Sequence, residues 1–231
     1  MPTKLENGFL PNRAKKPYQA DIVLSWDDYS VIFDFATEMA FGNGYHRSHR
    51  SGGSHQRDPN LIFRDVIEGK MGEFALYRYF ERNNIMITPP DCSIHKKGTW
   101  DGGDFQFRNS HNISIKTSKH FSQLLLLEKK DYQVEEGRVF YKHDKDAPDV
   151  IIFVRVCHNI ANFMKENNWT NIKDVKKDMY QDSKTTCEIS GYITNKDFKN
   201  LIDNDFIITK GTLLNGKVPM DADNYYIISS K

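Results

Sequence analysis

Two short alternating segments carry an acid and a lysine at a spacing that suits chemistry on a phosphodiester. Within WDGGDFQFRNSHNISIKTS (100–118), Asp104 stands at the start of the first segment and Lys116 near the end of the second. Alternation puts Ser114 and Lys116 on one face of their segment. If the segments pair antiparallel, Asp104 and Lys116 lie near the same end of the hairpin, where opposed Cβ atoms are about 4.5 to 5.5 Å apart.

A hard divalent cation is the cofactor that these residue types favour. Mg²⁺ prefers oxygen ligands, and the segments offer the Asp104 carboxylate and the main-chain carbonyl of Ile115. We expect Mn²⁺ to substitute for Mg²⁺. A bound metal lowers the pKa of its water and stabilises charge on phosphoryl oxygens, and Lys116 could orient that water. The alternative without chemistry is a salt-bridged hairpin at a sheet edge.

These residues resemble the core of the PD-(D/E)XK nuclease superfamily. Gly103-Asp104 and SIKTS (114–118) are similar to its acid and lysine motifs, and GKMGEFA (69–75) is similar to the helix that often carries an extra acid, here Glu73. The segments 148–156 and 189–193 resemble the strands that follow in type II restriction endonucleases. The resemblance runs from about residue 57 to residue 194.

The resemblance implies a Mg²⁺-dependent, sequence-specific endonuclease that cleaves double-stranded DNA. A homodimer on a palindromic site is then the expected assembly, because two-fold symmetry in the protein matches that of the site. A companion DNA methyltransferase is implied genetically, as is a prokaryotic cytoplasm. The alternatives are a junction resolvase or repair nuclease of the same fold, and a non-catalytic DNA-binding module.

The chain departs from the family pattern at Ser114, where the family carries Asp or Glu. Glu73 on the upstream helix is the favoured replacement, and Glu128 in the LLLLE segment is the alternative acid. Asp101 is a weaker rival to Asp104, because it precedes the strand. Either glutamate could instead be an ordinary solvated carboxylate.

Two polar segments are candidates for DNA contact. The first is a loop rich in Gly, Ser, His and Arg, whose side chains could reach phosphates or guanine edges. The second follows the lysine directly, where polar groups leaving an active-site strand could meet the DNA backbone. The candidate residues are His46, Arg47, His49, Arg50, His55, Arg57, Ser118, Lys119 and His120.

The elements that must position these residues can be predicted from periodicity and caps. Helices are expected over 26–41 with Ser25 as N-cap, from Asp58-Pro59 to about 83, and over 159–167, 171–180 and 196–203. Strands are expected over 85–87, 104–107, 113–116, 149–156, 188–194 and 225–229. Gly69 and Gly72 within the second helix indicate a close approach of another element, or a kink.

This order of elements predicts an α/β fold, with a mixed central β-sheet flanked by helices and a restriction-endonuclease-like core. We expect one domain over 1–231, with an irregular N-terminal arm (about 1–20) and a basic loop (about 42–57).

Composition excludes several other classes of protein. The formal net charge is only +1, so any basic surface must be local. No apolar run is long enough for a transmembrane helix, and the N-terminus lacks the apolar region of a secretory signal. Three widely separated cysteines favour a reducing cytoplasm over a disulfide framework. The sequence contains no phosphate-binding GxxxxGK[ST] loop and no GxSxG nucleophile motif.

Overall fold

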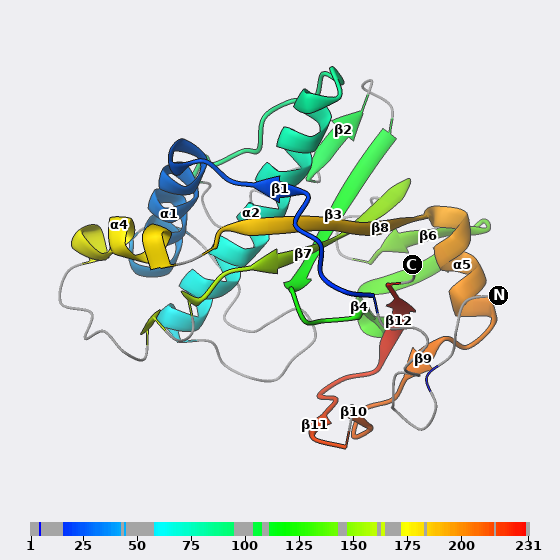
Figure 1. Cartoon of the computed structure of the whole chain (residues 1–231). Helices are drawn as coiled ribbons and strands as arrows, with labels where there is room; N and C mark the ends of the chain where they lie inside the picture. Colours follow the sequence, from blue (N-terminus) through cyan, green and yellow to red (C-terminus); the bar gives the residue numbers. More distant parts are fainter. Residues whose placement is uncertain are drawn as a thin grey trace.

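A five-stranded mixed sheet forms the centre of the computed structural model, in the order β1-β8-β7-β3-β2 (Figure 1). The structure describes residues 5, 16–42, 44, 58–94, 104–107, 111–142, 147–160, 163–164, 172–182, 184–214 and 216–229. The strands of this sheet are β1 (Ile22–Val23), β2 (Phe105–Phe107), β3 (His111–Lys119), β7 (Val150–Cys157) and β8 (Thr186–Thr194). β3 and β7 are parallel, whereas the other neighbours are antiparallel. The predicted α/β class with a mixed sheet is therefore confirmed.

The two long helices begin at the caps that the sequence predicts. α1 (Trp26–Phe41) opens with a capping box, in which Ser25 accepts from the Asp28 amide and Asp28 accepts from the Ser25 amide. α2 (Pro59–Arg82) follows Asp58, whose side chain accepts from the Leu61 amide at 2.8 Å. Both predicted helices are confirmed, because each cap satisfies amide groups that the first turn leaves without an intrahelical acceptor.

One face of the sheet is covered by α2, whereas α1 packs against α2 and α4 (Ile172–Asp182) packs against α1 (Figure 1). Ile115 of β3 and Val154 of β7 point into this layer, where they join Phe33, Phe63 and Met71 of the helices. This is the larger hydrophobic core of the chain, and it fixes which side chains of β3 are left for the opposite face.

The opposite face packs against smaller elements. Ile151 and Phe153 of β7 point this way and contact Leu127, Tyr132 and Phe198. The elements on this side include β4 (Leu124–Glu128), the 3₁₀ turn η2 (Lys129–Asp131), β5 (Tyr132–Glu135), β6 (Arg138–Tyr141), α5 (Asn195–Asp203) and β12 (Asn224–Ile228). The short strands β9 (Ile207–Ile208), β10 (Leu213–Leu214) and β11 (Val218–Pro219) extend this part of the chain.

The remaining predictions differ in outcome. The strands at 149–156, 188–194 and 225–229 and the helices at 171–180 and 196–203 are confirmed with shifted ends. The predicted strand at 85–87 is wrong: the segment pairs with no described strand, and Met86 is 93% exposed. Of the predicted helix at 159–167, residues 160 and 163–164 are helical, and the rest lies outside the described residues apart from Asn159, which is not helical.

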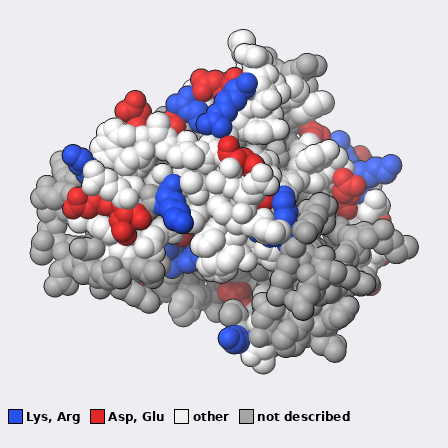
Figure 2. Space-filling view, in the orientation of Figure 1, with Lys and Arg blue, Asp and Glu red and all other residues white. Residues whose placement is uncertain are grey.

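Two observations bear on the surface. No helix within the described ranges is long and apolar enough to span a membrane. On the face drawn in Figure 2, cationic and acidic side chains are interspersed over the described residues and form no large area of one sign. The basic loop at 42–57 lies outside the described residues except for Gly42 and Gly44, as do residues 1–15 of the arm except for Leu5.

Candidate functional site

Asp104 lies beside the second strand of the hairpin, where the alternation predicts it. β2 and β3 pair antiparallel with Phe105 opposite Ile113, so Asp104 comes level with Ser114. The Oδ2 atom of Asp104 accepts a hydrogen bond from Ser114 Oγ at 3.2 Å and from the Ile115 amide at 2.5 Å. The serine thus holds the acid in place through its hydroxyl group.

Lys116 shares the face of Ser114 and lies against a tyrosine. Its Nζ atom is 5.3 Å from the centre of the Tyr141 ring, and the Tyr141 hydroxyl is 3.0 Å from Ser114 Oγ. Tyr132 donates from its own hydroxyl to that of Tyr141 at 3.4 Å. Asp104, Ser114, Lys116 and the two tyrosines therefore form one polar cluster between β3 and the β5–β6 hairpin.

The tyrosines are presented by a tight two-residue turn. Tyr132 and Tyr141 are directly paired across β5 and β6, with their ring centroids 4.8 Å apart. Glu136 and Gly137 join the strands with φ of 48° and 79°. Positive φ at both central residues is the geometry whose twist matches that of the flanking strands. The turn thereby fixes the register that places the tyrosines beside Lys116.

The charge of Lys116 is retained in this setting. Burial acts to lower the pKa of the ammonium group, but the neighbouring Tyr141 and the negative charge of Asp104 outweigh it, with a smaller contribution from Asp131. The net result is a pKa above the ordinary lysine value, so Lys116 is a cation at neutral pH. A fixed cation beside an acid suits the stabilisation of a developing negative charge.

Glu73 lies on the helix that covers the other face of β3. A Cβ atom at the preceding residue, Gly72, would come within 2.1 Å of Thr117 and 3.4 Å of Ile115. These two side chains alternate with Ser114 and Lys116 and point away from them. Glu73 itself makes an ion pair of 2.6 Å with Lys70, which also donates to the Asp91 carbonyl at 2.7 Å.

Glu128 ends β4 and pairs with Lys130 at 3.1 Å. Its side chain is largely buried, and this burial raises its pKa despite the lysine. Along β4, Glu128 alternates with Leu127, which packs on the side of β7. The structure therefore brings Asp104, Ser114 and Lys116 together and places both glutamates in other ion pairs. Which carboxylate stands beside Asp104 in a metal-bound state stays a prediction.

The donor set near Asp104 fits a cation that keeps part of its water. Within the described chain, Oδ1 of Asp104 accepts no hydrogen bond, so one carboxylate oxygen is available. The N–H and C=O groups of a strand residue point to the same side of the strand; since the Ile115 amide donates to Asp104, the Ile115 carbonyl is directed to the same side of β3. Among the described residues, no group of three His, Cys, Asp or Glu is arranged to hold a metal. Mg²⁺ commonly uses one or two carboxylates with waters and substrate phosphates.

Sequence reasoning missed the tyrosine pair and Asp131. Asp131 precedes Tyr132 and acts on the charge of Lys116. The available signal was the YQVEEGRVFY segment (132–141), in which alternating residues flank a central Glu-Gly and so indicate a hairpin. Nothing in that segment indicates that its tyrosines meet β3.

The predicted DNA-contacting residues fall into two groups. His46, Arg47, His49, Arg50, His55 and Arg57 lie outside the described residues. Ser118, Lys119 and His120 lie at the end of β3 and in the turn that follows, with each side chain partly exposed. Their contact with DNA stays a prediction.

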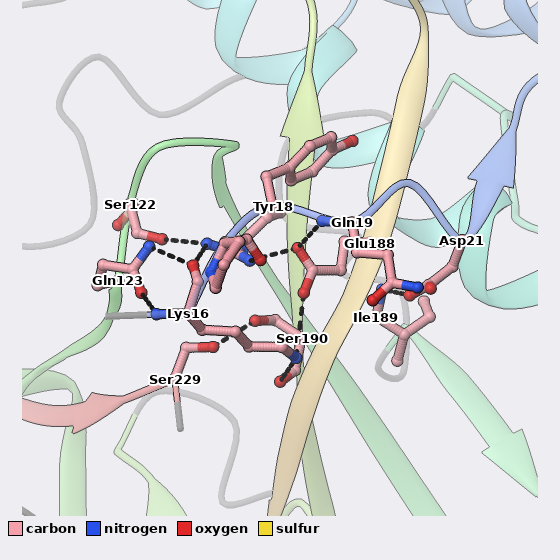
Figure 3. Close-up of polar contacts among 12 residues, drawn as sticks. Lys16, Tyr18, Gln19, Asp21, Ser122, Gln123, Glu188, Ile189, Ser190 and Ser229 are labelled. Atoms are coloured by element: carbon pink, nitrogen blue, oxygen red, sulfur yellow. Dashed lines mark hydrogen bonds and ion pairs between the residues drawn. The ribbon is translucent and has the colours of Figure 1, made fainter. Parts of the chain in front are cut away.

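A second polar cluster ties the N-terminal arm to the sheet (Figure 3). Arg155 of β7 is fully buried, ion-paired with Glu188 of β8, and donates to the carbonyls of Lys16 at 3.1 Å and Pro17 at 2.9 Å. Lys16 returns an ion pair to Glu188 at 3.0 Å. Residues 16–21 form no helix or strand, and these contacts hold them against β8.

Comparison with known proteins identifies no relative of the chain. No protein-family model matches the chain, and neither a curated protein nor a solved structure matches it.

Proposed function

We propose that the chain is a metal-dependent DNA endonuclease with a restriction-endonuclease-like core, acting on specific sites in double-stranded DNA as type II restriction enzymes do. The observation that carries the proposal is the Asp104 carboxylate, bound by Ser114 Oγ and the Ile115 amide, on the strand pair that presents Lys116. The resemblance described above supplies the reaction, and a homodimer on a palindromic duplex is the assembly that it implies.

Each residue of the cluster has a role in this proposal. Asp104 and the Ile115 carbonyl would hold Mg²⁺, or Mn²⁺ in its place, with Glu73 as the favoured second acid and Glu128 as the alternative. The metal would supply an activated water and charge stabilisation. Lys116, held cationic beside Tyr141, orients that water and stabilises the charge that develops on the phosphate. Ser114 positions Asp104 through its hydroxyl hydrogen bond.

Replacement of Lys116 by alanine tests this proposal. We expect digestion of plasmid and phage DNA in Mg²⁺ to give discrete bands with the unmodified protein. The cleavage rate of the Lys116→Ala variant should be lower by a factor on the order of 100 or more. Duplex binding in Ca²⁺ should survive. Lys217→Ala is the matched control, since it removes the same charge from the β10–β11 connection. Cleavage by Lys116→Ala at the unmodified rate would refute the assignment.

A calorimetric titration with Mg²⁺ or Mn²⁺ separates the proposal from its alternatives. Binding should weaken in Asp104→Asn, because the substitution removes the charge of the predicted ligand and keeps its shape. Equal heats for the two proteins would favour the non-catalytic DNA-binding module. Preferential cleavage of branched over linear duplex would instead favour the junction resolvase or repair nuclease.

A further inference from the structure

The turn that ends β3 projects one aromatic side chain into solvent. Ser122 donates from its amide to the Lys119 carbonyl at 2.8 Å, which closes a turn with His120 and Phe121 at its corner. The His120 amide donates to the Val156 carbonyl at 2.8 Å and so keeps the turn on the sheet. Phe121 is 69% exposed.

The backbone on the far side of this turn is held by the arm. Gln123 exchanges two hydrogen bonds with the main chain of Lys16, accepting at 2.7 Å and donating at 2.9 Å. Arg155 donates to the Ser122 carbonyl at 3.3 Å. These hydrogen bonds therefore hold the residues on either side of Phe121, while its ring is largely exposed.

Aromatic contacts continue from the arm to the exposed ring. The Tyr18 and His120 rings meet edge to face at 5.7 Å, and the His120 and Phe121 rings meet edge to face at 5.3 Å. A ring held in this way loses little conformational freedom when a ligand stacks on it. The exposed ring thus has the features of a prepared stacking surface.

Two lysines, Lys119 and Lys184, lie near this turn, whereas the buried charge of Arg155 is paired with Glu188. The positive charges of Lys119 and of the exposed Lys184 both disfavour protonation of the His120 ring. Burial lowers the pKa of His120 first, and the positive charges of Arg155, Lys184 and Lys119 lower it further. Lys119 is three residues along β3 from Lys116, or about 10 Å at strand spacing. Since residues an odd number apart point to opposite faces of a strand, a polyanionic strand bound at Lys116 would pass around the end of β3 to reach the turn.

We propose that Phe121 is a stacking surface for an unpaired base of single-stranded DNA, with Lys119 and Lys184 binding the flanking phosphates. Aromatic rings beside cations recognise single strands in this manner, since every base offers a face for stacking. The inference rests on the proposed function in one respect: the bound strand is the one that continues to Lys116. The substrate of the Lys116 cluster would then be a duplex that is locally opened, with one unpaired strand bound at Phe121.

Fluorescence anisotropy with a labelled oligo-dT strand, in Ca²⁺ and low salt, tests the proposal. We expect Phe121→Ala to weaken oligo-dT binding roughly 10- to 100-fold, and Phe121→Trp to bind at least as tightly as the unmodified protein. Tyr192→Ala is the matched control, because Tyr192 is 71% exposed on β8, and it should bind normally. Lys119→Gln should reduce the salt slope of single-strand binding by about 0.7.

Three results would overturn the inference. They are normal oligo-dT binding by Phe121→Ala, an equal loss in Tyr192→Ala, and an equal loss by Phe121→Ala on a fully paired duplex of the same length. The last would mean that the ring inserts into paired DNA. If Lys116→Ala abolishes cleavage while Phe121→Ala binds oligo-dT normally, only this inference fails. If Lys116→Ala cleaves normally, the proposed function fails on its own test.

Discussion

An alanine at Gly72 would put a methyl group into the contact between α2 and β3. Its Cβ atom would lie 2.1 Å from Thr117 Cγ2, whereas carbon atoms rest about 3.5 to 4.0 Å apart. The overlap is therefore at least about 1.4 Å, and Thr117 is β-branched and restricted at χ1. Overpacking of this kind costs about 1 to 3 kcal/mol, against about 1 kcal/mol gained from helix propensity. We expect Gly72→Ala to lower the free energy of unfolding by up to about 2 kcal/mol.

Gly69 provides a matched control in the same helix. A Cβ atom there would meet nothing within 4 Å, so Gly69→Ala should raise the free energy of unfolding by about 0.5 to 1 kcal/mol. Urea denaturation at constant m-value measures both changes. The double variant Gly72→Ala/Thr117→Ser removes the clashing methyl group and should recover most of the loss. Stabilisation by Gly72→Ala equal to that by Gly69→Ala would refute the packing of α2 on β3.

Two further predictions concern buried charge. His158 accepts from the Ile160 amide through Nδ1 and lies 3.0 Å from the Tyr29 hydroxyl, and burial lowers its pKa to about 3. On acidification the unfolded state binds a proton at this histidine before the folded state does, so the free energy of unfolding is full above pH ~6.5 and falls by about 2 kcal/mol between pH 7.5 and 5. In urea titrations the His158→Gln variant should lack this loss. A pH profile identical to that of the unmodified protein would contradict the prediction. Arg155→Met should lower the free energy of unfolding by about 3 to 5 kcal/mol and make the chain at Lys16 accessible to trypsin. Arg138 is exposed, so Arg138→Met should lower it by at most about 1 kcal/mol. Equal losses for the two variants would contradict the stabilising role of the buried Arg155 ion pair.

The parts of the fold that could be predicted are those determined by residues that are close together in the sequence. Ser25 and Asp58-Pro59 mark helix starts, because the groups that satisfy the first turn are adjacent in the chain. The apolar run at 150–156 predicts a strand buried on both faces, and β7 has one core on each side. The alternation of 104–107 and 113–116 likewise predicts which side chains of the hairpin share a face.

The parts that could not be predicted depend on pairing between distant segments. The apolar residues at 85–87 suggest a strand, but no strand among the described residues pairs with them, and Met86 faces solvent. β4 reads as an uninterrupted leucine run, and only its pairing with β12 decides which leucines are buried. The ion pair of Arg155 with Glu188 spans 33 residues, and the hydrogen bond from Arg155 to Lys16 spans 139.

The serine at position 114 shows why the second acid of the site resists prediction from spacing. A carboxylate there would face that of Asp104 across the strand pair, and like charges so placed repel unless a cation lies between them. The hydroxyl of Ser114 instead donates to Oδ2 of Asp104 and lies 3.0 Å from the Tyr141 hydroxyl, which among the described residues leaves Oδ1 of Asp104 open to a cation. A cation would then find one carboxylate on the hairpin and must draw its other oxygen ligands from water, from the DNA phosphate or from another element. Which element that is depends on how α2 and β4 pack against β3, and the local motif does not encode this packing.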